Sequence, residues 1–149
     1  MLAGDVMATA GDLPGSLHYY SNRHDAPPRV LEPGVYGLSN AFLDSPWPKV
    51  AAGKTALATA LDALPDEAPL FELLRDDDVH PDDALPRTGV SLDWERLLSS
   101  AFVRAPGYGT RSSTVLTAGA AGRVTFTEQT WLEEGRPGGR VNFSFDLTC

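Results

Sequence analysis

The strongest constraint on the fold is a strict alternation near the C-terminal end of the chain. Apolar and polar residues alternate one by one along Val141–Leu147. A period of two is typical of a strand with one apolar face. Two further runs with strand composition, 112–118 and 123–132, precede it and are separated by a glycine-bounded turn. The last third of the chain therefore predicts a three-stranded antiparallel meander.

The middle of the chain has helical spacing instead. We expect helices over 49–64, from about Pro69, and after a Ser91 N-cap. Two apolar stripes support this prediction: Val50, Leu57, Leu61 and Leu64 in the first helix, and Trp94, Leu97, Leu98, Ala101 and Phe102 in the third. An irregular entry (1–15) and two paired strands (16–23 and 29–38) come first, and 76–89 is expected to be a surface loop. Segregated helices and strands predict one α+β domain over 1–149.

Composition excludes several partners and points to a compartment. The 149-residue chain has a net charge of −8 and no basic stripe, so we expect no nucleic acid partner. Its single cysteine, Cys149, and an N-terminus without basic residues suggest a reducing, cytoplasmic location. No run approaches the ~20 apolar residues of a membrane span. The three histidines lack the spacing of metal ligands: His18, His24 and His80. The acidic run from Asp76 lacks the pattern of a calcium loop, so no metal is expected.

Two dense segments, 34–49 and 107–117, combine glycines, aromatics and polar residues in a pattern too irregular for a plain helix or strand. Loop clusters of this kind often carry a site. In the first, the amide of Asn40 could donate to an oxyanion, although Asn also forms turns. In the second, Arg111 stands among small residues. It could bind a planar or anionic group, or be an ordinary surface arginine.

Five strings together resemble the NRDE family, which includes the transport and Golgi organization protein 2 homologues. The resemblance runs from about Leu2 to Leu132. The strings are YYSNR (19–23), YGLSNAFLDSPWPK (36–49), LPRTGV (85–90), DWERLLSSAFV (93–103) and YGTRSST (108–114).

The resemblance implies an N-terminal-nucleophile hydrolase-like fold, a four-layer αββα sandwich of antiparallel sheets with helices. It also implies acyl-amide (C–N bond) hydrolase-like chemistry for an intact member. By their positions in the motifs, Asn40 would help to form an oxyanion hole and Arg111 would orient the nucleophile or hold substrate. The same strings supply the supporting pocket candidates Asn22, Arg23, Ser39, Asp44, Thr110 and Ser112.

The chain departs from the family pattern at its start. Leu2 follows Met1 where the family has a cysteine, and no Asn-Arg-Asp-Glu string occurs. We therefore expect a C-terminal portion that lacks the N-terminal strands and exposes an apolar sheet face and edge. Without the nucleophile, catalysis by this chain alone is not expected. The alternative is a non-catalytic binding or carrier protein related to haem or the secretory pathway, although no covalent or bis-histidine haem motif is present.

Overall fold

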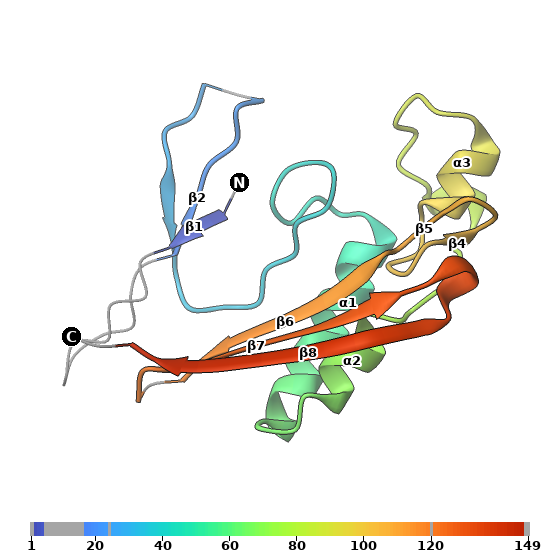
Figure 1. Cartoon of the computed structure of the whole chain (residues 1–149). Coiled ribbons are helices and arrows are strands. Elements are labelled where there is room, and N and C mark those ends of the chain that lie inside the picture. Colours follow the sequence, from blue (N-terminus) through green and yellow to red (C-terminus); the bar gives the residue numbers. More distant parts are fainter. Residues whose placement is uncertain (1, 5–16, 24, 120, 148–149) are drawn as a thin grey trace. The chain divides into compact units, whose positions relative to one another are not determined.

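The C-terminal strands form the meander that the alternation predicts. In the computed structural model, β6 (Ser112–Ala118), β7 (Arg123–Trp131) and β8 (Pro137–Asp146) form one sheet in the order β6-β7-β8 (Figure 1). Strand β8 begins four residues before the predicted run, because the loop after β7 is only a short 3₁₀ turn, η3 (Glu133–Gly135). The structure describes residues 2–4, 17–23, 25–119 and 121–147, so His24 and Cys149 lie outside the described residues.

The two faces of this sheet differ in their surroundings. On the inner face, Val115 packs into a core cluster with Ala60, Leu70 and Phe71. Trp131 is also buried, and its indole Nε1 donates to Ser113 Oγ at 2.9 Å. On the outer face, Phe143 is 61% exposed. This exposure agrees with the expected open apolar sheet face.

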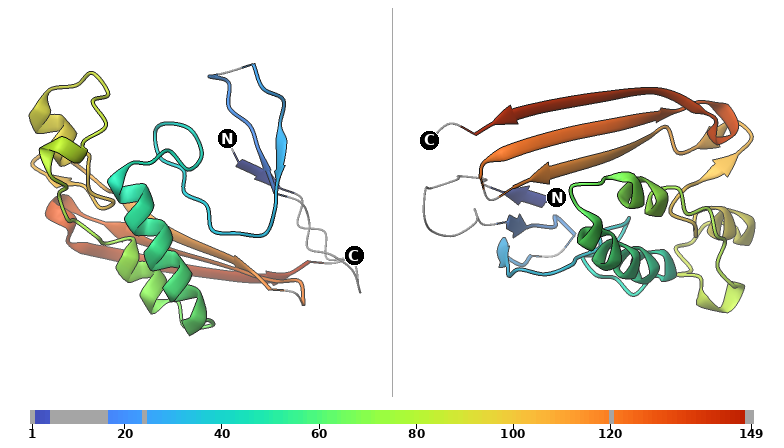
Figure 2. Two further views of the ribbon diagram at one scale, coloured as in Figure 1. Left: turned by 180° about the vertical axis from the view of Figure 1, so that it is seen from behind. Right: turned by 90° about the horizontal axis from the view of Figure 1, so that it is seen from below.

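The first two helices lie along the inner face of the sheet. Helix α1 (Pro48–Ala60) and the 3₁₀ turn η1 (Leu61–Ala63) fill the first predicted helix, and α2 (Ala68–Leu73) follows (Figure 2). The predicted core stripe is wrong at its end, because Leu61 and Leu64 are 44% and 40% exposed. The chain leaves α-helical geometry after Ala60, so the 3.6-residue spacing of the stripe does not extend to Leu61 and Leu64. The buried residue at this end of the helix is Ala60.

The third helix, α3 (Leu92–Leu97), is much shorter than its apolar stripe predicts. Ser91 is the N-cap as expected, although its side chain makes no capping bond. After Leu97 the chain turns, and Ser99 Oγ donates to the Arg96 carbonyl at 2.7 Å. Side chains beyond Leu97 therefore leave the helical stripe. Trp94 is 43% exposed, and the buried residue of the helix is Glu95.

Burial of Glu95 is accounted for by hydrogen bonds from Thr88. The Glu95 carboxylate accepts the Thr88 hydroxyl at 2.8 Å and the Thr88 backbone N–H. Thr88 lies in the stretch 76–89, which is a loop as predicted except for the 3₁₀ turn η2 (Asp82–Ala84). The acidic helix residue thus fixes the end of this loop.

A hairpin that the sequence did not suggest joins α3 to the meander. Strands β4 (Arg104–Ala105) and β5 (Tyr108–Gly109) pair in an antiparallel manner. Gly107, at φ +71°, makes the turn between them. The string Ala105-Pro106-Gly107 predicts the end of a helix, but Pro106-Gly107 is also an ordinary turn dipeptide.

The N-terminal region forms a small antiparallel sheet in the order β1-β2-β3. Its strands are β1 (Leu2–Gly4), β2 (Leu17–Tyr19) and β3 (Arg29–Leu31). The predicted pairing of the second and third strands is confirmed, and Leu17 lies opposite Leu31. Two expectations are corrected. Residues 2–4 pair with β2 instead of being irregular, and β3 ends at Leu31, before Pro33, whose missing N–H cannot extend a ladder.

Antiparallel sheets with helices on one face confirm the α+β class. The residues group into two compact units. The first contains 1–34, 116–126 and 142–149, and the second contains 35–115 and 127–141. The core cluster and the two cavities described below belong to the second unit.

Candidate functional site

The first dense segment is folded into a loop by Asp44. The backbone N–H of Asp44 donates to the Gly37 carbonyl at 2.7 Å, and Asp44 Oδ1 accepts the Gly37 N–H at 2.9 Å. Asp44 has φ +57°, a conformation that Asp tolerates better than most residues. These reciprocal bonds close the chain over residues 37–44 into a compact loop.

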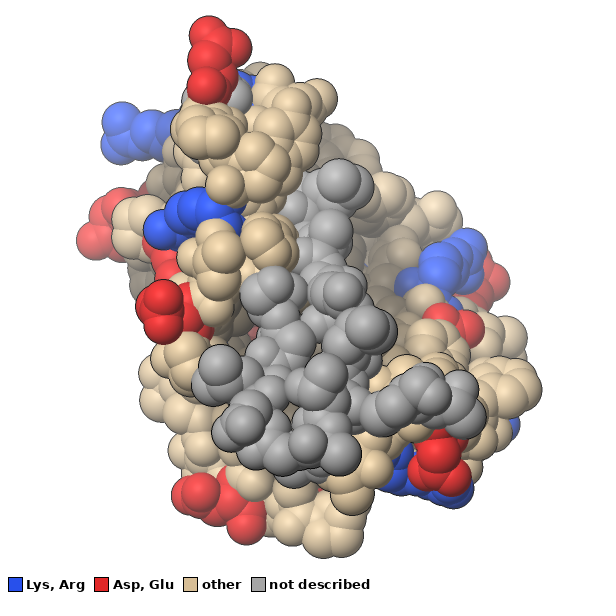
Figure 3. Space-filling model, turned by 90° about the vertical axis from the view of Figure 1, so that its left-hand side faces the viewer, with Lys and Arg blue, Asp and Glu red and all other residues tan. Residues whose placement is uncertain are grey.

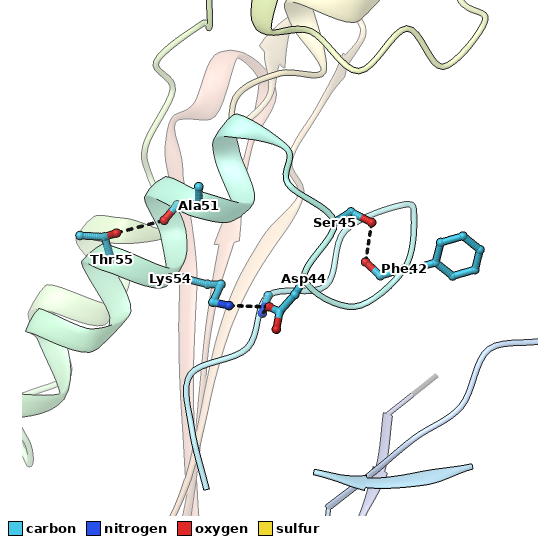
Figure 4. A network of polar contacts seen from close by, with 7 residues as sticks. Phe42, Asp44, Ser45, Ala51, Lys54 and Thr55 are labelled. Carbon is cyan, nitrogen blue, oxygen red and sulfur yellow. Dashed lines mark hydrogen bonds and ion pairs between the residues drawn. The ribbon is translucent and has the colours of Figure 1, made fainter. Parts of the chain in front are cut away.

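Helix α1 is attached to this loop through the same carboxylate. Lys54 Nζ lies 2.7 Å from Asp44 Oδ1, as Figure 4 shows. Both side chains are one-third exposed, so this ion pair itself adds under about 1 kcal/mol. Gly37 is required at the loop base, because a Cβ there would lie 2.6 Å from Val50 Cγ1. The loop therefore sits directly against α1.

A cavity of about 340 Å³ lies between this loop and the first two helices. This volume is in the range of small-molecule sites. Four α1 residues at offsets 0, 3, 4 and 7 form one wall: Val50, Gly53, Lys54 and Leu57. Other lining residues come from the loop, α2 and the segments after the helices: Tyr36, Leu38, Ser39, Leu73, Leu74, Asp76 and Ala101. Most of the lining is apolar, with a few polar groups among it.

Lys49 is the most perturbed polar group of this lining. Partial burial lowers the pKa of the Lys49 ammonium below its ordinary value. Its Nζ donates to the Leu98 carbonyl at 2.7 Å and lies 6.0 Å from the centre of the Trp47 ring. The carbonyl bond orients one of the three ammonium donors. The cavity thus has a fixed cationic donor in an apolar wall.

The second dense segment borders a much smaller cavity, of about 30 Å³. Its lining includes Thr110, Arg111 and Glu134. Thr110 closes the hairpin, since its N–H donates to the Val103 carbonyl at 2.8 Å and its Oγ1 accepts the Val103 N–H at 2.9 Å. A space of this size holds a few water molecules at most. It is not a site for an organic ligand.

The predicted site residues are distributed between these places. Ser39 lines the larger cavity, and Arg111 and Thr110 line the smaller one. Asn40 is exposed and borders neither of the two cavities. Asp44 and Thr110 act through loop closure, as described above. Neither cavity contains both Asn40 and Arg111.

The remaining candidates are surface residues. Ser112 is exposed at the start of β6. Asn22 and Arg23 are exposed in a turn after β2 and belong to the first unit, where the Arg23 N–H donates to Ser21 Oγ at 3.3 Å. The sequence interpretation missed Lys49, Gly53 and Lys54 as cavity residues. The helical spacing from Val50 to Leu57 is the signal for this wall, but the same spacing is also typical of a helix face packed in the core.

The charge distribution of the described surface is mixed. On the face drawn in Figure 3, basic and acidic side chains lie interspersed among uncharged ones. Within the described residues, no group of three or more His, Cys, Asp or Glu side chains is placed to hold a metal ion. No helix in the described part of the chain is long and apolar enough to cross a membrane.

The fold and site define an α+β protein with a small-molecule-sized cavity beside its first helix. A family model described as Transport and Golgi organisation 2 matches residues 1–133. The chain is 37% identical over 143 residues to the human "Transport and Golgi organization protein 2 homolog" and 40% identical over 143 residues to the bovine one. These matches cover 90% and 89% of this chain, respectively.

The chain therefore belongs to the Transport and Golgi organisation 2 family. The matches cover 51% of the human relative and 50% of the bovine one. The chain thus spans about half the length of the curated relatives that it matches.

Proposed function

We propose that this chain contributes a small-molecule binding pocket to a protein of the Transport and Golgi organisation 2 family. The observation that carries the proposal is the cavity of about 340 Å³ lined by the Asp44 loop, α1 and α2. Its apolar walls would enclose the body of a ligand, and Lys49 would donate to an acceptor atom of that ligand. Pockets of this composition are typical binding sites.

The fold supports a likeness to hydrolases, but the cavity residues do not supply a catalytic set. A helix layer on one face of an antiparallel sheet is what one half of an αββα sandwich would contain. Ser39 has a hydroxyl that could act as a nucleophile in the cavity, but no histidine or cysteine in the described part of the chain lines it. Lys54 is paired with Asp44, and Lys49 with the Leu98 carbonyl, so neither is held against Ser39 as a base. We propose that the chain alone does not hydrolyse acyl amides.

A haem carrier is the second candidate from the sequence, and the cavity residues do not fit that group. The common axial ligands of haem are His, Cys, Met and Tyr. Among the residues that the structure describes, Tyr36 is the one side chain of these types that lines the cavity. We therefore favour an organic ligand with an apolar body and derive no step through haem.

The test is a change that fills the cavity without disturbing the loop. A Cβ at Gly53 would have no heavy atom within 4 Å, so Gly53→Leu places a side chain in the open space of the cavity wall. The probe is the naphthalene dye ANS, followed by the backbone amide shifts of Gly37 and Gly53 in NMR titrations of the whole chain. Ala52→Leu, on the exposed side of the same helix, is the matched control.

We expect the Ala52→Leu variant to bind the dye as the wild type does and Gly53→Leu to bind it at least tenfold more weakly. Unchanged binding by Gly53→Leu would overturn the pocket. Release of nitroaniline from an acyl-nitroanilide by the wild-type chain, above the rate in buffer, would overturn the claim that it does not hydrolyse alone.

A further inference from the structure

The charged residues in the lining of the larger cavity are Lys49, Lys54 and Asp76, and their partners differ. Lys54 is neutralised by Asp44, whose Oδ1 lies 2.7 Å from Lys54 Nζ (Figure 4). Asp76 Oδ1 accepts the backbone N–H of Asp78 at 3.0 Å. Lys49 is a cation without a counter-charge, because no ion pair in the described part of the chain includes it.

The surroundings of Lys49 favour an anionic partner. One of its three ammonium donors is used by the Leu98 carbonyl, which carries only a partial charge and leaves the cation uncompensated. Partial burial lowers the pKa of Lys49, as expected for an ammonium that has lost water and gained no carboxylate. A partly desolvated charge is unfavourable unless it is paired. An anionic ligand group would supply that pair.

We propose that the cavity selects an organic monocarboxylate with an apolar body, and that Lys49 is the residue that binds the carboxylate. This inference rests on the proposed binding pocket and names the chemical class of its ligand. The two remaining donors of Lys49 would donate to the carboxylate oxygens, and the apolar walls would cover the rest of the molecule. Hydrogen bonds between charged groups are about twice as strong as neutral ones, so this contact would determine selectivity.

Asp76 limits the charge of the ligand. Its carboxylate belongs to the same lining, so it would repel a second negative charge in the cavity. A dianion such as a phosphate monoester should therefore bind less tightly than a carboxylate. A cationic ligand would have Asp76 as its partner and Lys49 as a repelling neighbour, and it is the opposite case that the experiment includes.

The experiment compares four probes with the same apolar ring: 2-naphthoate, 2-naphthylmethanol, 2-naphthylmethylamine and 2-naphthyl phosphate. NMR titrations of the whole chain at about pH 7.5, where the phosphate is mostly a dianion, follow the backbone amide shifts of Gly37 and Gly53. The variant is Lys49→Gln, which keeps an N–H donor for the Leu98 carbonyl but has no charge. Arg136→Gln is the control, because Arg136 is exposed and borders neither cavity.

We expect the wild type to bind 2-naphthoate at least tenfold more tightly than each of the other probes. Lys49→Gln should lose this preference through weaker naphthoate binding alone, and Arg136→Gln should keep it. Thermal melts followed by circular dichroism show whether a variant is folded, and Lys49→Met replaces Lys49→Gln if the latter unfolds.

The outcomes separate this inference from the pocket itself. Binding of the neutral alcohol as tight as that of naphthoate would overturn the inference and leave the pocket in place, whereas no binding of any probe would overturn both. A preference for the amine, or a carboxylate preference that survives in the folded Lys49 variant, would also overturn it. Phosphate binding as tight as that of naphthoate would overturn the selection of a single charge.

Discussion

The two glycine-rich segments that the sequence brings to attention are held in different ways. The first, 34–49, is closed by one carboxylate, because Asp44 binds both the Gly37 N–H and Lys54. The second, 107–117, is held by buried backbone and aromatic contacts. Trp131 donates its backbone N–H to the Arg111 carbonyl at 2.7 Å and its indole N–H to Ser113.

This difference accounts for the size of the two cavities. The Asp44 clamp fixes the ends of its loop and leaves a space of about 340 Å³ between the loop and the helices. The packed aromatic support of the second segment leaves about 30 Å³. The first segment, closed at its base, can border a ligand site. The second segment is packed along its length and stabilises the core. The predictions below test this contrast.

The largest effect is expected from removing the support of the second segment with Trp131→Ala. Trp131 is 4% exposed, its ring meets Phe102 edge to face at 5.1 Å, and Arg75 lies 5.0 Å from its ring centre. Loss of a large buried aromatic costs about 3–5 kcal/mol in the free energy of unfolding. Urea denaturation measures this change. A cost below about 1 kcal/mol would contradict a core role for the segment.

The clamp of the first segment is tested by Asp44→Ala. Alanine lacks the acceptor for Gly37 and disfavours the positive φ of this position, so we expect a loss of about 1–2 kcal/mol. We also expect weaker ANS binding, because the loop borders the cavity. Asp44→Asn retains tolerance of positive φ and one oxygen acceptor, and it should lose less in both measurements. Equal losses in the two variants would show that the charge of Asp44, rather than its loop geometry, is what matters.

A smaller effect is expected from Thr110→Val in the second segment. The substitution keeps the shape of the side chain but removes the acceptor of the Val103 N–H, a partly buried bond of 2.9 Å. One lost hydrogen bond of this kind costs about 1 kcal/mol. Unfolding in urea measures this loss in the free energy of unfolding. Because the second segment does not border the larger cavity, we expect ANS binding there to be unchanged. Weaker dye binding would show that the two segments are coupled.

Period-two and helical patterns predicted the regular elements well. Strand β6 has the predicted bounds, helix α1 begins at Pro48, and α2 begins at Ala68 with Pro69 in its first turn, where the fixed φ of proline suits a helix. The pattern failed at α3, where Trp94 and Leu97 fit a stripe but Ser99 and Ser100 bond back to the chain and end the helix. Periodicity records which residues are apolar, and local side-chain bonds decide where a helix stops.

The site was predicted less completely. Motif position pointed to Asn40 and Arg111, and neither lines the larger cavity. Asp44 was marked as a supporting residue, yet its role depends on a bond to Gly37 seven residues away, which no spacing rule reveals. The cavity wall around Gly53 looked like core because spacing alone does not distinguish packed apolar residues from apolar residues that face an open space.

The smallest effect concerns the pH dependence that Lys49 gives to the first segment. Burial lowers the pKa of Lys49 in the folded protein below 10.5, so the unfolded chain binds more protons between the two pKa values. The free energy of unfolding should therefore rise with pH across that window and be constant below it. The Lys49→Met variant should lack this rise, so its stability relative to the wild type should fall as the pH approaches 10.5. Solvent screening keeps the effect small, because Lys49 is only partly buried.

Urea unfolding of both proteins from neutral pH to pH 10.5 measures this pH dependence. The Lys54→Met variant is the control, because Lys54 is a more exposed, ion-paired lysine. Parallel curves for the wild type and Lys49→Met would show that Lys49 is solvated like a surface lysine, and the cavity wall would then have no desolvated cation.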